Sequence, residues 1–358
     1  MFYSTNKLSK IFQTAESEIL QKPEIENVVK AHHLIEFHKD SEGEARGVGY
    51  AASEIPQLGE FIGYIKKPDD PKVISIFVTK GGVLKTTLTL NMARMAALHN
   101  MKTLVIGLDM QCDITSAMGI DFGANEDNLT SAMSEIDKMK GLSDFFYDRC
   151  EINDVILKTD LPTLDIIPET PELVAIEQSL LHRAKRELWL KEKVIVPLKS
   201  QYDLFIIDCS PNWNQLITNA LAASDLLISP LECKINNYRN FQMFRSFINE
   251  FKDEMDLSFE HLYIPTRLTQ SRKLSKEIRD WYVNEISNCV PFAIRDSIIG
   301  EEATAMNLSI PEYQPGSEAA KEINEVIQYI WQRFHPHGND HLSAQIELSQ
   351  NDRKDGIL

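Results

Sequence analysis

The sequence predicts a doubly wound α/β fold, in which a mainly parallel sheet carries helices on both faces. Seven short apolar runs rich in β-branched residues are the first observation: VISIFV, TLVIGL, LDIIP, LFIID, LLISPL, LYIP and CVPFAI. Stretches of helical length, such as 86–99 and 170–193, separate several of them. Continuous apolar strands joined by helical crossovers are typical of a parallel sheet that is covered on both faces. Ligands of such sheets bind at the carboxyl ends of the strands.

Composition limits the class of protein. The chain has 358 residues, of which 43% are hydrophobic and 25% charged, as in globular proteins. Its formal net charge is -16, so any contact with DNA requires a local basic patch. No apolar run approaches the roughly 18 residues that span a bilayer, and the N-terminal residues lack an apolar signal core. We therefore expect a soluble cytoplasmic protein. The five cysteines form no C-x-x-C pair, which argues against disulfide, zinc and iron–sulfur frameworks.

Three zones follow one another along the chain. Residues 1–70 form a polar segment, expected to be a small helical extension that ends in the linker KKPDDP. Within it, GYAASEIPQLGEFIGYI resembles the first helix of a helix-turn-helix, but Pro56 interrupts the pattern and no basic helix follows. An arm that packs on a dimer or binds a partner is therefore favoured over a degenerate DNA-binding segment. Residues 71–334 form the α/β domain, and residues 335–358 are a polar tail that we expect to be flexible.

The stretch VTKGGVLKTTL, residues 78–88, predicts a phosphate-binding loop. It follows an apolar strand and precedes a helix, which is the context that such a loop needs. Lys85 can reach the β- and γ-phosphates, and Thr86 offers a hydroxyl to Mg²⁺. A Gly-Gly turn before a helix with exposed polar residues is the less favoured interpretation. The sheet is thus expected to be of the P-loop NTPase type. The expected nucleotide-binding residues are Lys80, Gly81, Gly82, Val83, Leu84, Lys85, Thr86 and Thr87.

The loop KGGVLKTT resembles the deviant Walker A pattern, K-G-G-x-x-x-K-[ST], of the ParA/MinD family of ATPases. The resemblance implies ATP and Mg²⁺ as cofactors and a homodimer in which Lys80 reaches the nucleotide of the partner subunit. Lys80 and Lys85 are then catalytic residues. Leu84 stands where most ParA relatives have glycine, and a leucine is compatible with the loop if its φ angle is negative.

Two further motifs extend the resemblance, which covers about residues 72–334. TLVIGLDMQCDIT is similar to the family pattern D-x-D-P-Q-G-N-x-T, which makes Asp109 the residue that positions or activates the attacking water. Gly107, Met110 and Cys112 depart from that pattern. LFIIDCSPNWNQLITNAL resembles the Walker B segment, so Asp208 joins Thr86 as a predicted Mg²⁺ ligand. LDIIPETPEL is similar to a segment that reads P-A-T-P-E-L in the family.

The resemblance implies a slow ATPase that partitions plasmid or chromosomal DNA. Mg-ATP would drive a sandwich dimer that binds DNA without sequence preference on the nucleoid, and a ParB-like centromere-binding protein would stimulate hydrolysis. A cluster between 267 and 279 contains five basic residues against one acid, although a solvated helix face would look the same. The candidate DNA-binding residues are Arg267, Arg272, Lys273, Lys276, Arg279 and Arg295.

Other uses of the same ATPase stay open. A ParA-like protein can position a protein complex or other cargo. A MinD-like membrane ATPase is less favoured, because a polar tail and not a basic amphipathic segment follows the last expected helix, 317–334. The nucleotide-dependent reductases of the wider superfamily need paired cysteines. A protein that binds ATP without hydrolysing it is the non-enzymatic alternative, which a measurement of turnover would distinguish.

Overall fold

The computed structural model describes residues 2–21, 33–37, 45–120, 139–235 and 237–334. In these ranges the main domain is built on a seven-stranded sheet with the order β10-β9-β4-β8-β5-β7-β6. Every neighbouring pair is parallel except β6 and β7, so the predicted mainly parallel sheet is confirmed. The strands are β4 (Lys72–Ile76), β5 (Thr103–Leu108), β6 (Leu157–Lys158), β7 (Leu164–Ile167), β8 (Leu204–Cys209), β9 (Leu226–Glu232) and β10 (Glu260–Thr266).

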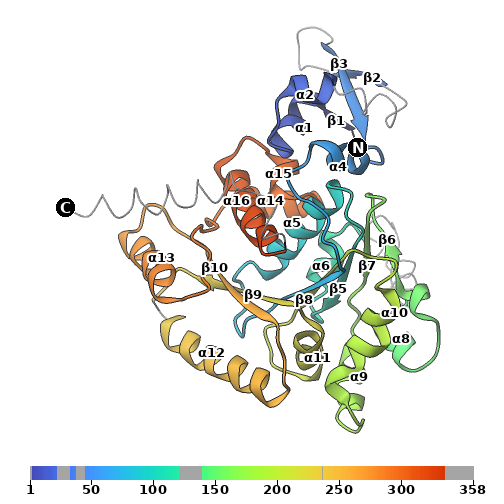
Figure 1. Cartoon of the computed structure of the whole chain (residues 1–358), viewed down its shortest axis with the longest axis vertical. Helices are drawn as coiled ribbons and strands as arrows, with labels where there is room; N and C mark the ends of the chain where they lie inside the picture. Colours follow the sequence, from blue (N-terminus) through green and yellow to red (C-terminus); the bar gives the residue numbers. More distant parts are fainter. Residues whose placement is uncertain (1, 22–32, 38–44, 121–138, 236, 335–358) are drawn as a thin grey trace, which may run out of the picture.

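Helices cover both faces of this sheet (Figure 1). Successive side chains of a strand point to opposite faces, so Ile74 and Ile76 pack with α5 and α16, whereas Val73 packs with α11 and α12. The α-helices of the domain are α5 (Lys85–Leu98), α6 (Asp113–Ala117), α8 (Leu142–Phe146), α9 (Leu173–Leu180), α10 (Val196–Leu198), α11 (Gln215–Ala223), α12 (Asn237–Glu254), α13 (Lys273–Glu285), α14 (Ile298–Ala305), α15 (Ile310–Tyr313) and α16 (Glu318–Gln332). Within the described ranges, no helix has the length and apolar character needed to cross a membrane.

Two expected elements of the domain differ in the structure. The run CVPFAI forms no strand. It meets β10 through the isolated bridge between Cys289 and Tyr263 and through the N–H of Ile294, which donates to the carbonyl of Pro265 at 3.0 Å, while Pro291 between them cannot donate a ladder hydrogen bond. The stretch 170–193 is not one helix. It divides into α9, a short 3-10 turn and the start of a π-helical turn, and Lys185 takes a left-handed conformation with φ 52°.

The N-terminal extension is not purely helical, which corrects the expectation from its composition. It contains α1 (Thr5–Ile11), α2 (Glu16–Gln21) and α4 (Ile55–Ile62), but also an antiparallel sheet of the order β1-β3-β2. The strands are β1 (Phe2–Ser4), β2 (His33–Phe37) and β3 (Ala45–Ala51). Phe2 pairs with Ala51, a partner far along the chain, and such non-local pairing is not visible in the local sequence pattern.

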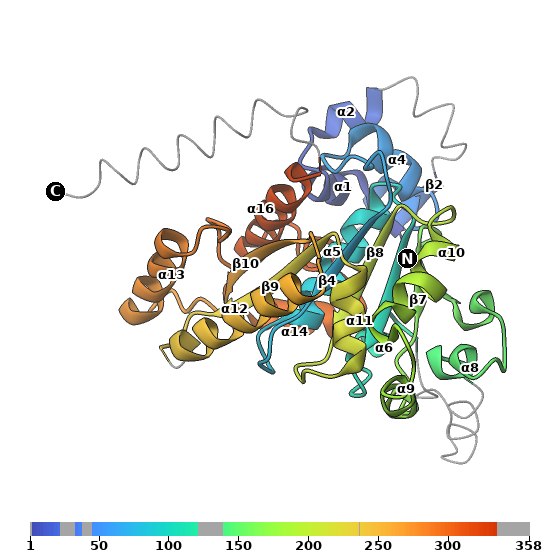
Figure 2. The same ribbon diagram turned by 60° about the horizontal axis from the view of Figure 1, so that its bottom comes forward.

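This extension packs onto the main domain beside α5 and α16 (Figure 2). Its buried side chains, such as Tyr3 and Leu58, belong to the same core as α5 and α16. Gly59 lies so close to α5 that a Cβ atom there would be 1.9 Å from the carbonyl oxygen of Leu98. Pro56 stands in the first turn of α4, where a proline is tolerated. The predicted tail, residues 335–358, lies outside the described residues.

Candidate nucleotide-binding site

The loop between β4 and α5 lies at the carboxyl end of the sheet and ends at the first turn of a long helix. Gly82 has φ 68°, and a Cβ atom there would meet no other atom within 4 Å, so the loop backbone is open at this point. Leu84, the N-cap of α5, has φ 71°, so the expected negative angle is wrong. This left-handed conformation costs a leucine roughly 1–2 kcal/mol. The side chain packs partly buried against the core, and this contact offsets some of the cost.

The side chain of Lys85 folds back under the loop. Its Nζ donates to the carbonyl oxygen of Lys80 at 3.1 Å, and the residue is buried. Burial lowers the pKa of Lys85, while the nearby carboxylates of Asp208 and Asp109 oppose that shift. The lysine is therefore held inside the curve of the loop, where a helix N-terminus and backbone N–H groups favour phosphate.

Asp208 lies at the end of β8, below the first turn of α5. It accepts hydrogen bonds from the hydroxyls of Thr86, at 2.8 Å, and Thr89, at 2.7 Å. Burial raises the pKa of Asp208 to about 6, against the effect of these hydrogen bonds and of Lys85. Sequence reasoning missed Thr89, although its place three residues after Thr86 puts both hydroxyls on one face of the helix.

The oxygen donors at Asp208 and Thr86 suit Mg²⁺. No cluster of three His, Cys, Asp or Glu side chains that could hold a metal occurs among the described residues. A site with one carboxylate and one hydroxyl fits Mg²⁺, which keeps several waters and takes further ligands from substrate phosphates.

Asp109 directly follows β5 and begins the segment 109–115. Its Oδ1 accepts from the backbone N–H of Gln111 at 3.1 Å. Cys112, which stands where the family pattern has glycine, has φ 58°. Like Leu84, it therefore has a backbone conformation that is typical of glycine. The buried Glu169, which sequence reasoning missed, contacts the same segment through the N–H of Asp109. Burial, and then the charge of Asp208, raise the pKa of Glu169 to about 9.

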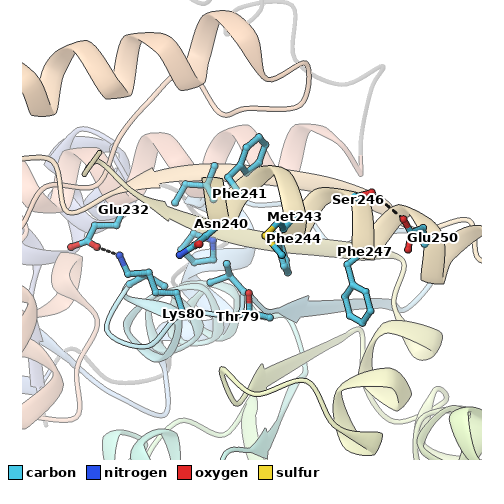
Figure 3. Close-up of a pocket in the computed structure, with 14 residues that line it drawn as sticks. Thr79, Lys80, Glu232, Asn240, Phe241, Met243, Phe244, Ser246, Phe247 and Glu250 are labelled. Carbon is cyan, nitrogen blue, oxygen red and sulfur yellow. Dashed lines mark hydrogen bonds and ion pairs between the residues drawn. The ribbon is translucent and has the colours of Figure 1, made fainter. Parts of the chain in front are cut away.

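Lys80 pairs with Glu232 at the end of β9, which also binds Lys234. Glu232 is another residue that the motifs did not identify. Beside this pair is a hollow of about 670 Å³ between the loop, the end of β9 and α12. Figure 3 shows the Lys80–Glu232 pair at one end and Phe247 and Glu250 at the other.

The predicted basic cluster divides into two groups. Arg267 donates to the carbonyl of Gly82 and, at 2.8 Å, to Asp296, so its guanidinium supports the phosphate loop. Arg295 binds Glu322 at 2.8 Å, and Arg279 pairs with Asp280 at the same distance. The remaining candidates, Arg272, Lys273 and Lys276, are exposed at the start of α13, where Lys273 pairs with the exposed Glu277 at 3.5 Å.

A glycine-containing loop between a parallel strand and a helix, with a lysine and a threonine above a strand-ending aspartate, defines a P-loop nucleotide-binding protein. The family model described as an AAA domain (AAA_31) matches residues 71–261, more than half of the chain. The chromosome partitioning protein ParA of Myxococcus xanthus is 30% identical over 220 residues, which cover 60% of this chain and 73% of that protein. The chain belongs to the ParA family of P-loop ATPases.

Another relative agrees with this assignment, and two solved structures share the fold. The sporulation initiation inhibitor protein Soj of Bacillus subtilis is 27% identical over 72% of this chain and 98% of its own length. A putative plasmid partition protein of Borrelia burgdorferi bound to AMPPNP has the same fold, with a TM-score of 0.60 at 22% identity over 74% of this chain and 99% of that one. Cobyrinic acid a,c-diamide synthase of Mycobacterium smegmatis with ADP and magnesium gives the same TM-score and identity over 74% and 95%.

Proposed function

We propose that this protein is a partition ATPase that uses Mg-ATP to control its own dimerisation and its binding to DNA. The observation that carries the proposal is the two-lysine loop. Lys85 lies inside the loop, as a lysine that binds the nucleotide of its own subunit would, whereas the side chain of Lys80 is 37% exposed and lines the hollow beside the loop, where it pairs with Glu232. A partly exposed lysine beside a nucleotide site is suited to reach the phosphates of a second subunit.

Each polar group of the site has a part in hydrolysis. Lys85 and the loop N–H groups bind the phosphates, and Thr86 with Asp208 holds Mg²⁺. Asp109 positions or activates the attacking water. Lys80 can contribute its charge to the phosphates of a partner only after it leaves Glu232. The ion pair between Lys80 and Glu232 therefore belongs to the monomeric state.

Dimerisation is supported by the surface next to Lys80. The hollow between the loop and α12 exposes Met243 and Phe247, with 74% and 41% of their surface accessible. Contiguous exposed apolar side chains at a functional site mark interaction surfaces. We infer that a second copy of the chain covers this face when ATP is bound. The relatives named for partition of chromosomes and plasmids support DNA as the surface on which the dimer acts.

The test compares nucleotide states. The purified protein is expected to be a monomer with ADP and a dimer with ATP in light scattering, and only the ATP form should bind non-specific duplex DNA. Asp109→Ala should form a stable ATP dimer without hydrolysis, while Lys85→Ala should prevent the dimer. Equal DNA binding with ADP and with ATP would contradict the proposal, and a ParB-like partner should raise phosphate release from the dimer.

A further inference from the structure

Glu169 is a buried carboxyl group that no sequence motif assigned, and it lies against the segment that carries Asp109. It follows β7 by two residues, and β7 is the parallel neighbour of β5, which leads directly into Asp109. The two strands lie side by side in Figure 1. A side chain from the loop after β7 therefore crosses the carboxyl end of β5, and Glu169 is fully buried there.

The carboxyl group of Glu169 accepts three hydrogen bonds from the segment 109–115. The N–H of Asp109 donates to Oε1 at 3.2 Å, while Thr115 donates to Oε2 through its N–H and its hydroxyl, each at 3.3 Å. The hydroxyl of Thr115 in turn accepts from the N–H of Glu169 at 2.9 Å. Asp109 and Thr115, the two ends of the segment, thus both bind the side chain of Glu169. The backbone N–H of Glu169 binds Thr115 in return.

Gly107 explains how this side chain fits. A Cβ atom at Gly107 would lie 2.1 Å from Cγ and 2.7 Å from Cδ of Glu169. A side chain at 107 and the present position of Glu169 therefore exclude each other. The patterns of the family have aspartate at the place of Gly107 and alanine at that of Glu169. An aspartate at 107 would put its carboxyl group into the space that Glu169 occupies.

We propose that Glu169 is a positioning residue for ATP hydrolysis, which holds the segment 109–115 in place of a carboxyl group on β5. This inference rests on the proposed role of Asp109. The side chains of Lys85 and Thr86 donate to Lys80 and Asp208, so the contacts that bind nucleotide do not pass through Glu169. Loss of Glu169 should then affect the hydrolytic step more than the binding of ATP.

The first test is Glu169→Gln, measured as phosphate release over a range of Mg-ATP concentrations. The amide has one acceptor oxygen and one NH2 group, so it cannot accept from both Asp109 and Thr115, and the segment loses one of its two attachments to residue 169. We expect kcat to fall about tenfold or more, since small misplacements of reacting groups have effects of this size, while KM stays within about twofold. Glu172→Gln is the matched control, because Glu172 is exposed three residues further on, and its kcat should not change.

Rescue distinguishes positioning from simple packing. Gly107→Asp alone collides with Glu169 and should lower kcat or stability, whereas Gly107→Asp combined with Glu169→Ala should recover kcat to within about threefold of the wild type, since the relocated carboxyl group restores the geometry that the reaction needs.

The outcomes separate the two proposals. If Asp109→Ala leaves turnover unchanged, the proposed role of Asp109 is wrong and the inference on Glu169 is lost with it. If Asp109→Ala stops turnover but Glu169→Gln lowers only the unfolding midpoint and leaves kcat intact, then Glu169 is a packing residue and only the inference is overturned.

Discussion

At the scale of single residues, Leu84 and Cys112 share one property: each holds a left-handed backbone conformation at a position where the family pattern has glycine. The fold therefore imposes the glycine conformation whatever the residue. For Leu84 the conformational cost and the packing of its side chain against the core act in opposite directions.

A matched pair of variants separates these two effects. Leu84→Ala and Leu84→Gly both remove the packing, but only glycine removes the cost of the left-handed conformation. We expect Leu84→Gly to exceed Leu84→Ala by about 1 kcal/mol in the free energy of unfolding, measured in urea. Because the loop already has the glycine geometry, ATP turnover of Leu84→Gly should stay within about threefold of the wild type. An alanine variant more stable than the glycine variant would contradict the assigned backbone conformation.

The motifs predicted the residues that meet at the nucleotide loop, but not the partners that hold them. Lys80, Lys85, Asp109 and Asp208 stand in local patterns whose spacing is informative. Glu169, in contrast, reaches Asp109 through the adjacency of β5 and β7, two strands that are distant along the chain. The sequence contained one signal for this contact. Compared with the family patterns, this chain lacks a carboxyl group at Gly107 and has an additional one at Glu169.

At the scale of elements, a buried ion-pair network joins the N-terminal extension to the ATPase domain. Arg94 of α5 is fully buried and binds Glu312 of α15 at 2.7 Å and Asp160 at 2.8 Å. Tyr3 of β1 donates to the same Glu312 at 2.7 Å. Three separate elements thus depend on one carboxylate, which has its charge and hydrogen bonds satisfied.

Glu312→Gln should destabilise the fold strongly. It removes the negative charge nearest to a buried guanidinium, and breaking such a pair costs about 3–5 kcal/mol. The measurement is the free energy of unfolding in urea at neutral pH. Glu318→Gln is the control, since Glu318 is exposed and its pairs with Lys321 and Arg295 should contribute little to stability. Similar losses in both variants would show that the network around Arg94 does not stabilise the protein.

The same carboxylate gives a dependence on pH. Burial by itself would raise the pKa of Glu312, but Arg94 and the hydrogen bonds from Arg94, Tyr3 and Ser309 hold it at about 2, below the ordinary 4.5. A group with a depressed pKa stabilises the fold above its unfolded pKa, and this contribution is lost as the pH falls through the folded pKa. The stability difference between wild type and Glu312→Gln should therefore be constant above about pH 5 and shrink from about pH 4.5 to about pH 2. A difference that grows on acidification would contradict this sign.

The sequence predicted strands correctly where the apolar runs were long. It did not predict strands whose pairing partner lies far along the chain. Runs such as LFIID and LLISPL are buried on both faces, so their sequence alone indicates a central parallel strand. In the extension, β1 pairs with the remote β3, as between Phe2 and Ala51, and the composition of the extension did not show this. Local patterns therefore predicted the ATPase domain better than the extension.

At the scale of the whole molecule, the face formed by α12 and Lys80 is expected to be covered in the ATP dimer. Met243→Asp places a charge on this face and should reduce the ATP-dependent dimer at least about tenfold, since a buried, unpaired charge at an interface costs several kcal/mol. Light scattering with Mg-ATP measures the effect, and nucleotide affinity of the monomer checks that the site is intact. Val196→Asp, at an exposed position of α10, is the control and should dimerise like the wild type. Unchanged dimerisation of Met243→Asp would place the interface elsewhere.

The charge distribution determines how such a dimer can bind DNA. The chain carries a formal net charge of -16, so its general field repels a polyanion and binding must come from a local surface. Arg272, Lys273 and Lys276 are exposed at the N-terminal end of α13, where the helix dipole adds positive potential. Arg267 also donates to the carbonyl of Gly82, and Arg295 binds Glu322 of α16, so we assign these two to the support of the loop and of α16 and not to DNA.

Arg272→Ala combined with Lys276→Ala should weaken DNA binding of the ATP dimer and leave ATP affinity unchanged. Each phosphate contact contributes about 0.9 to the slope of log K against log salt concentration, so a dimer that loses two per subunit should show a slope smaller by up to about 3.6. A salt titration of fluorescent duplex DNA measures that slope. The control is Lys191→Ala with Lys193→Ala, which removes the same charge from exposed positions next to α10, near the opposite edge of the sheet from α13 (Figure 1). Equal loss of affinity and slope in both double variants would show that the net charge of the molecule, and not the surface of α13, determines its binding to DNA.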